Sequence, residues 1–146
     1  MKRVTSILLS IRSLMKLYEQ ISGEVHTDYR LSQMEIKIIT FLHNNPGKDT
    51  IGDIAELRML PKGNVSLGVE SLVQKSLLER TPDKTDRRKI HLSLTADAAP
   101  LAAAIEETNA LFQERIFEGF TQEEILQYSR MNDRLMENAK KWLERK

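Results

Sequence analysis

The sequence contains no cysteine, so disulfide bonds, thiol chemistry and cysteine-ligated metals are excluded. Aromatic residues make up only 5% of the 146 residues, and the apolar runs are too short to cross a bilayer. Leu, Ile, Met, Glu, Lys and Ala are abundant instead, and this composition favours helices. With 40% hydrophobic and 29% charged residues, the chain is predicted to form one domain, residues 1–146, with a sizeable core.

The N-terminus, MKRVTSILLSIRSLMK, has a charged start before an apolar stretch. Serines and an arginine interrupt that stretch at helical spacing, so the pattern favours an amphipathic helix over a signal peptide and predicts a cytoplasmic protein. The helix should span about residues 2–22 and end at Gly23. Its apolar positions follow the i, i+3, i+4, i+7 spacing: Val4, Ile7, Leu8, Ile11, Leu14, Met15, Tyr18 and Ile21.

Two later helix starts are marked by a capping box, Ser32 with Glu35 and Thr121 with Glu124. A third start has Thr50 as a plausible cap, with Asp53 three residues on. The helix after Thr50 should run to about Arg58, and Pro61 fits the first turn of a further helix that ends near Lys75. Two short helices joined by a tight turn indicate a helix-turn-helix.

A β-hairpin is predicted after these helices. LLERTPD reads as a short strand, DKTDRR as a charged turn, and KIHLSLT as a second strand in which apolar residues alternate with polar ones. Helical spacing returns from Ala96 to about Gly119 and again after Thr121.

The expected fold class is therefore mainly α (α+β), a winged helix-turn-helix with long terminal helices. Residues 31–95 should form the DNA-binding lobe. Residues 1–24 and 96–146 carry more apolar surface than one small domain can cover, and they are predicted to be dimerisation helices of a homodimer.

The charged turn, residues 83–88, has two interpretations. It can be a solvated hairpin turn, which is the usual fate of such a run. It can also contact DNA, because arginine suits the negative potential of a narrow minor groove. Asp86 lies two positions before Arg88 and could hold its side chain extended.

Two stretches resemble a known family. DRRKIHLSLT looks like the wing of MarR-type winged helix-turn-helix regulators, whose motif is Asp-x-Arg followed by β residues and Leu-Thr. IAELRMLPKGNVSLGVESLVQKSLLER resembles the helix pair before that wing. The chain departs from the pattern at Leu67, where arginine is common, at Gly68 in mid-helix, and at Ser76, where glycine is usual.

The resemblance implies a transcriptional regulator, a homodimeric repressor that binds a pseudo-palindromic operator in double-stranded DNA. The second motif helix would read the major groove, Arg88 would enter the minor groove, and Arg87 would contact phosphate or groove. The implied DNA-binding residues are Lys62, Asn64, Ser66, Leu67, Ser71, Lys84, Asp86, Arg87 and Arg88.

The resemblance also implies a crevice for a small aromatic ligand near Ile11, Met15, Met34 and Ile38, although the same residues can be ordinary core. The alternative function is a winged-helix module that binds another protein, which Leu67 and the weakly basic recognition helix favour. No enzymatic motif, cofactor, metal site or membrane segment is expected, and His26, His43 and His91 lack metal-ligand spacing.

Overall fold

The computed structural model describes residues 1–145, except for the side chains of Glu24, His26 and Thr27. The chain forms two compact units, residues 1–111 and 112–146. The elements of the first unit are α1 (Arg3–Tyr29), α2 (Gln33–Asn44), α3 (Ile51–Arg58), α4 (Lys62–Gln74), β1 (Leu78–Pro82), β2 (Ile90–Leu94), the short 3-10 helix η1 (Ala96–Ala98) and most of α5 (Ala99–Ile116). The second unit contains the end of α5 and α6 (Gln122–Glu144).

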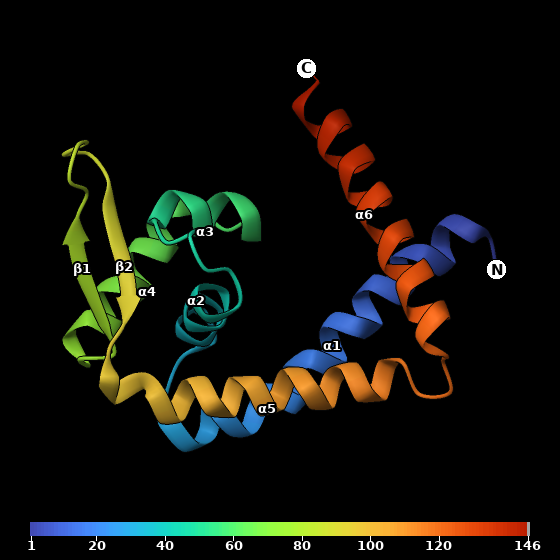
Figure 1. Cartoon of the computed structure of the whole chain (residues 1–146), viewed down its shortest axis with the longest axis horizontal. Helices are drawn as coiled ribbons and strands as arrows, with labels where there is room; N and C mark the ends of the chain where they lie inside the picture. Colours follow the sequence, from blue (N-terminus) through green and yellow to red (C-terminus); the bar gives the residue numbers. More distant parts are fainter. Residues whose placement is uncertain (146) are drawn as a thin grey trace. The chain divides into compact units, whose positions relative to one another are not determined.

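The first unit is built as a winged helix-turn-helix (Figure 1). Helices α2, α3 and α4 pack on one another, and β1 and β2 pair antiparallel as a two-stranded wing. One continuous core joins these elements to α1 and α5. Its fully buried members include Ile38, Ile39, Ile54, Val65, Val69 and Leu72. The mainly α winged helix-turn-helix expected from the sequence is confirmed.

Both predicted capping boxes are present, and the predicted cap Thr50 forms a third one with Asp53. In each one the Ser or Thr hydroxyl accepts a hydrogen bond from the backbone N–H three residues on, and the acidic side chain accepts one from the cap's own N–H. Each box satisfies two N–H groups that the helix itself cannot pair. The starts of α2, α3 and α6 therefore agree with the prediction.

The predicted end of α1 was wrong. The helix continues through Gly23 to Tyr29. Glycine costs about 1 kcal/mol in a helix interior, but the added turns bring Val25 into the core, and burying an aliphatic side chain stabilises by about 1.5–3 kcal/mol. The helix ends instead at Tyr29, and the next residue, Arg30, has a left-handed φ of 52°.

The end of α4 explains one departure from the family pattern. Ser76 has a φ of 62°, a left-handed conformation that glycine adopts without strain. The N–H of Leu77 donates to the carbonyl of Leu72, and that of Ser76 donates to the carbonyl of Val73, which closes the helix in a Schellman motif. Ser76 thus occupies a position where the backbone itself favours glycine.

Two smaller boundaries differ from the prediction. Pro61 precedes α4 rather than lying in its first turn, and its carbonyl accepts from the N–H of Val65. The helix predicted from Ala96 begins with a single 3-10 turn before α5. In the described chain, no helix is both long and apolar enough to span a membrane.

Candidate nucleic-acid interface

Helix α4 presents a mixed polar and apolar face to solvent. Val65, Val69 and Leu72 are buried, so the opposite side of the helix is left exposed. The sequence-predicted residues Lys62, Asn64 and Leu67 are exposed, and Ser66 and Ser71 are half-buried. Leu67 is 72% exposed, which is unusual for a large apolar side chain on a well-packed helix. The face can offer an amide, a cation and an apolar contact to a ligand.

Gly68 sets how closely α4 lies on α2. A methyl group at this position would meet Cδ1 of Ile38 at 2.6 Å and Cγ of Met34 at 3.0 Å. Because Ile38 is fully buried, it has little room to move away. The glycine that costs helix propensity therefore avoids a close contact with the side chains of α2.

A buried carboxylate ties the end of α4 to the start of α2. Glu35 is buried, and its two oxygens accept from Lys75 Nζ at 3.0 and 2.8 Å, while Oε2 also accepts from the Ser71 hydroxyl at 3.1 Å. Burial alone would raise the pKa of Glu35, but the hydrogen bonds from Lys75, Ser32 and Ser71 outweigh it and lower the pKa. The Ser71 hydroxyl and the Lys75 ammonium group therefore already have a hydrogen-bond partner within the protein.

The acidic residue on the exposed face of α4 is also paired. Glu70 forms an ion pair with Arg80 of β1, and this hydrogen-bonded partner lowers the pKa of Glu70. The pair neutralises the charge that would oppose a polyanion, and it connects α4 to the wing.

The turn at the tip of the wing is organised by Asp83. Its Oδ2 accepts from the N–H of Thr85 at 3.0 Å, the hydroxyl of Thr85 at 3.0 Å and the N–H of Asp86 at 2.8 Å. The N–H of Asp83 donates to the carbonyl of Lys89. These bonds give the short turn a defined backbone conformation.

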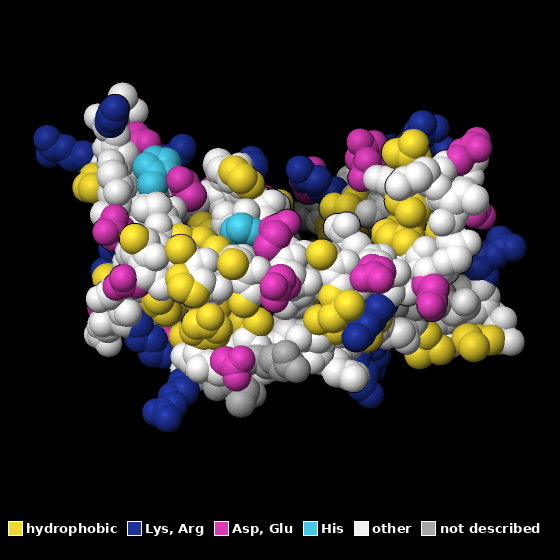
Figure 2. Space-filling model, turned by 60° about the horizontal axis from the view of Figure 1, so that its bottom comes forward, with side chains coloured by type: hydrophobic (Ala, Val, Ile, Leu, Met, Phe, Trp, Pro, Cys, Tyr) yellow, Lys and Arg dark blue, Asp and Glu magenta, His cyan; other side chains and the backbone are white. Residues whose placement is uncertain are grey.

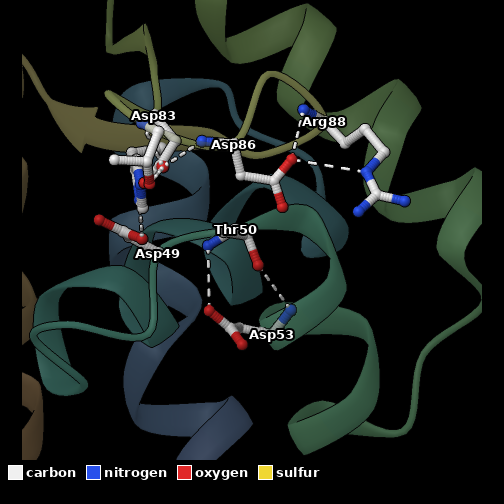
Figure 3. A network of polar contacts seen from close by, with 8 residues as sticks. Asp49, Thr50, Asp53, Asp83, Asp86 and Arg88 are labelled. Atoms are coloured by element: carbon white, nitrogen blue, oxygen red, sulfur yellow. Dashed lines mark hydrogen bonds and ion pairs between the residues drawn. The ribbon is translucent and has the colours of Figure 1, made fainter.

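Beyond this turn, Asp86 faces Arg88 as the sequence predicts (Figure 3). Its Oδ1 accepts from the Arg88 N–H at 3.0 Å and lies 3.5 Å from Arg88 Nε. The Arg88 side chain remains 93% exposed. Lys84 and Arg87 are also exposed, and Figure 2 shows Lys and Arg side chains projecting from the tip of the wing.

His91 is the important residue that the sequence reasoning missed. Its Nδ1 lies 2.7 Å from Asp49 Oδ1 and its Nε2 lies 2.6 Å from Asp83 Oδ1. One signal was present in the sequence, a histidine on the polar side of a strand that follows an Asp-containing turn. The other carboxylate, Asp49, is 42 residues away in the chain, and only the fold brings it close.

The four residues predicted to line a ligand crevice lie on different elements. Met34 and Ile38 lie beneath Gly68 on α2. Ile11 and Met15 lie on the exposed stripe of α1. A crevice that combines the two pairs remains a prediction.

The histidines form no metal centre in the part of the chain that is described. His43 pairs with Glu106 of α5 at 2.7 Å, and His91 pairs with two aspartates. The side chain of His26 lies outside the described residues. Among the described side chains, no group of three or more His, Asp or Glu residues could hold a metal ion.

Known proteins resemble this chain both in part of its sequence and in its fold. Residues 31–89 match the sequence model of the MarR family. In fold, the chain is similar to the MarR protein from Peptoclostridium difficile DA00132 (TM-score 0.78, 20% identity, 96% of this chain and 92% of that chain) and to NMB1585, a MarR family regulator from Neisseria meningitidis (0.74, 24%, 98% and 97%). It is also similar to Bordetella bronchiseptica BpsR, whose DNA binding is regulated by 6-hydroxynicotinic acid (0.66, 19%, 92% and 99%). No curated protein matches the sequence.

Proposed function

We propose that this chain, which matches the MarR family in sequence over residues 31–89 and has the MarR fold over nearly its whole length, is a DNA-binding transcriptional regulator. It acts as a homodimeric repressor on a pseudo-palindromic operator. Helix α4 enters the major groove and the wing enters the adjacent minor groove.

The observation that carries the proposal is the wing tip. Arg88 is almost fully exposed at the end of a hydrogen-bonded turn, with Asp86 in contact at one side. Among the described residues, Lys62, Lys84, Arg87 and Lys89 form no ion pair, whereas Glu35 and Glu70 are neutralised by partners within the protein. Cations therefore dominate the surface that would face DNA, although the whole chain has a net charge of only +1.

Dimerisation is supported by uncovered apolar surface in each unit. The face of α1 that carries Val4, Leu8, Ile11 and Met15 is exposed, and α6 buries none of its residues. The exposed apolar side chains of α6 are Leu126, Tyr128, Met131, Leu135, Met136, Trp142 and Leu143. Helices of this kind gain stability by packing on a second copy.

A small aromatic ligand is a further part of the proposal. BpsR responds to 6-hydroxynicotinic acid, and its fold is similar to that of this chain. The corresponding site here would lie near Ile11, Met15, Met34 and Ile38, and ligand binding would weaken DNA affinity.

The test is selection of bound sites from random double-stranded DNA, together with the DNA upstream of the protein's own gene, followed by footprinting. The expected result is one enriched inverted repeat, with protected half-sites about 10 base pairs apart or a near multiple of that spacing. A single unpaired half-site would contradict the symmetric dimer, and the absence of any enriched sequence would contradict the function.

A second function, docking to another protein, is favoured by one observation. Leu57, Met59 and Leu67 are all more than half exposed on the helix-turn-helix. Exposed apolar side chains of this kind are typical of protein-binding surfaces. In that case substitution of Leu67 would disrupt the protein complex, and DNA binding would be weak and independent of sequence.

A further inference from the structure

We propose that His91 is a positioning residue for DNA binding: by bridging Asp49 and Asp83 it fastens the wing tip to the helix-turn-helix, so that DNA affinity falls when the imidazolium loses its proton. This inference rests on the proposed function, because it concerns how the wing is held for contact with DNA.

The bridge adds to a backbone hydrogen bond that already joins the wing to the loop before α3. His91 lies on β2 opposite Thr81, and the N–H of the next residue, Leu92, donates to the Asp49 carbonyl at 2.8 Å. That bond fixes the middle of β2 to the loop before α3. The His91 ring extends the attachment to Asp83. Asp83 lies beyond the end of β1 and organises the tip (Figure 3).

The same two carboxylates are connected to the residues that would face DNA. Asp49 directly precedes Thr50, which caps α3. Asp83 binds the N–H of Asp86, and Asp86 in turn contacts Arg88. A chain of hydrogen bonds therefore runs from the helix-turn-helix through His91 to Arg88. Loss of the central ring should leave Arg88 on a wing that moves more freely.

The protonation state follows from the partners. A carboxylate only accepts hydrogen bonds, so a ring that bonds two carboxylates must donate from both nitrogens, and only the imidazolium has two N–H groups. A neutral ring would keep one bond and direct a lone pair at the other carboxylate. In the described chain, the charged groups that face the ring are Asp49 from the loop before α3 and Asp83 from the wing.

The direction of the pH effect follows from this chemistry. The hydrogen bonds to Asp49 and then Asp83 raise the pKa of His91 above 6.5, its ordinary value. The bond from His91 and the backbone N–H groups of Asp86 and Thr85 hold the pKa of Asp83 well below its usual range. The bridge is therefore complete below the ordinary pKa of histidine, and it is lost as the pH rises through the raised pKa of His91.

The experiment measures affinity for the selected operator at constant ionic strength from about pH 6 to about pH 9. For the unaltered protein we expect affinity to fall about tenfold across this range, as one charge-assisted hydrogen bond is lost. His91→Gln should bind about tenfold more weakly at the low end, with a flat pH profile. Asp49→Asn removes one of the two carboxylates that raise the pKa of His91, so the fall in DNA affinity should occur at lower pH.

Two controls separate this role from a general structural one. His43→Gln removes another histidine and should keep the pH profile of the unaltered protein. In an Arg88→Ala background, His91→Gln should change affinity much less than it does alone, because the bridge acts through the placement of Arg88. A pH profile shared by His91→Gln and the unaltered protein, on an operator that both bind, would overturn the inference and leave the proposed function standing.

Hydrogen exchange makes the inference testable without DNA. The amides of Thr85, Asp86 and Leu92 should exchange faster at high pH in the unaltered protein, and at all pH values in His91→Gln after correction for intrinsic rates. If no operator is found, the proposed function fails, and these amides still decide whether His91 fastens the wing. Equal protection in both proteins at every pH would overturn the inference.

Discussion

At Gly68, a hydrogen atom in place of a methyl group lets α4 lie on α2. The sequence alone suggests a weak point in the helix, because glycine has poor helix propensity. In the structure, glycine instead favours packing of α4 on α2, because a Cβ at this position would lie only 2.6 Å from Cδ1 of buried Ile38. A sequence shows the propensity of a residue but not the distance to a side chain 30 positions away.

Gly68→Ala should lower the free energy of unfolding by about 1 kcal/mol, because overpacking costs about 1–3 kcal/mol and the gain in helix propensity returns about 1 kcal/mol. Urea unfolding measures the change. Gly63→Ala is the matched control, because it lies in the same helix with nothing within 4 Å of the added methyl group, and it should be no less stable than the unaltered protein. Equal stability of the two variants would contradict the account.

Leu67 should contact a thymine methyl group, the one apolar group that base edges present in the major groove. Replacing that thymine by uracil in the operator should weaken binding by about 0.8 kcal/mol, the value of one buried carbon group. In Leu67→Ala the two operators should bind alike, whereas Asn64→Ala should still distinguish them. If no thymine position shows such a difference, Leu67 does not read DNA.

The elements were predicted well where a local signal marks them and less well where tertiary packing decides. Capping boxes and the alternating strand placed α2, α3, α6 and the wing, because these features depend on residues close together in sequence. The extension of α1 past Gly23 depends on burial of Val25, which no local pattern shows. For the same reason the pairing of Lys75 with Glu35 could not be foreseen.

As an element, the wing should contribute to DNA affinity through charge as well as through insertion. If Arg87 meets only phosphate, Arg87→Ala should weaken binding to all sequences alike and reduce the salt slope by roughly 1. Asp86→Ala should lose part of the contribution of Arg88 without itself touching DNA, because its carboxylate positions the arginine. Affinity measured against salt concentration separates the two cases. An unchanged slope in Arg87→Ala would exclude a phosphate contact.

For the whole molecule, the account requires a dimer, because each protomer has one recognition helix and one wing. Deleting residues 125–146 removes most of the exposed apolar face of α6 and should give monomeric or aggregated protein. Sedimentation equilibrium measures the outcome. A soluble, folded dimer after this deletion would show that α6 is not needed for assembly.

The most direct test of the central claim is the operator affinity of Arg88→Ala, measured beside its unfolding midpoint. Because Arg88 is almost fully exposed, the substitution should leave stability nearly unchanged. Operator binding should weaken by about 1–3 kcal/mol, most strongly at sites with A·T-rich flanks, where the narrow minor groove attracts arginine. Unchanged affinity in a folded Arg88→Ala protein would contradict the account and make the two arginines of the wing a solvated turn.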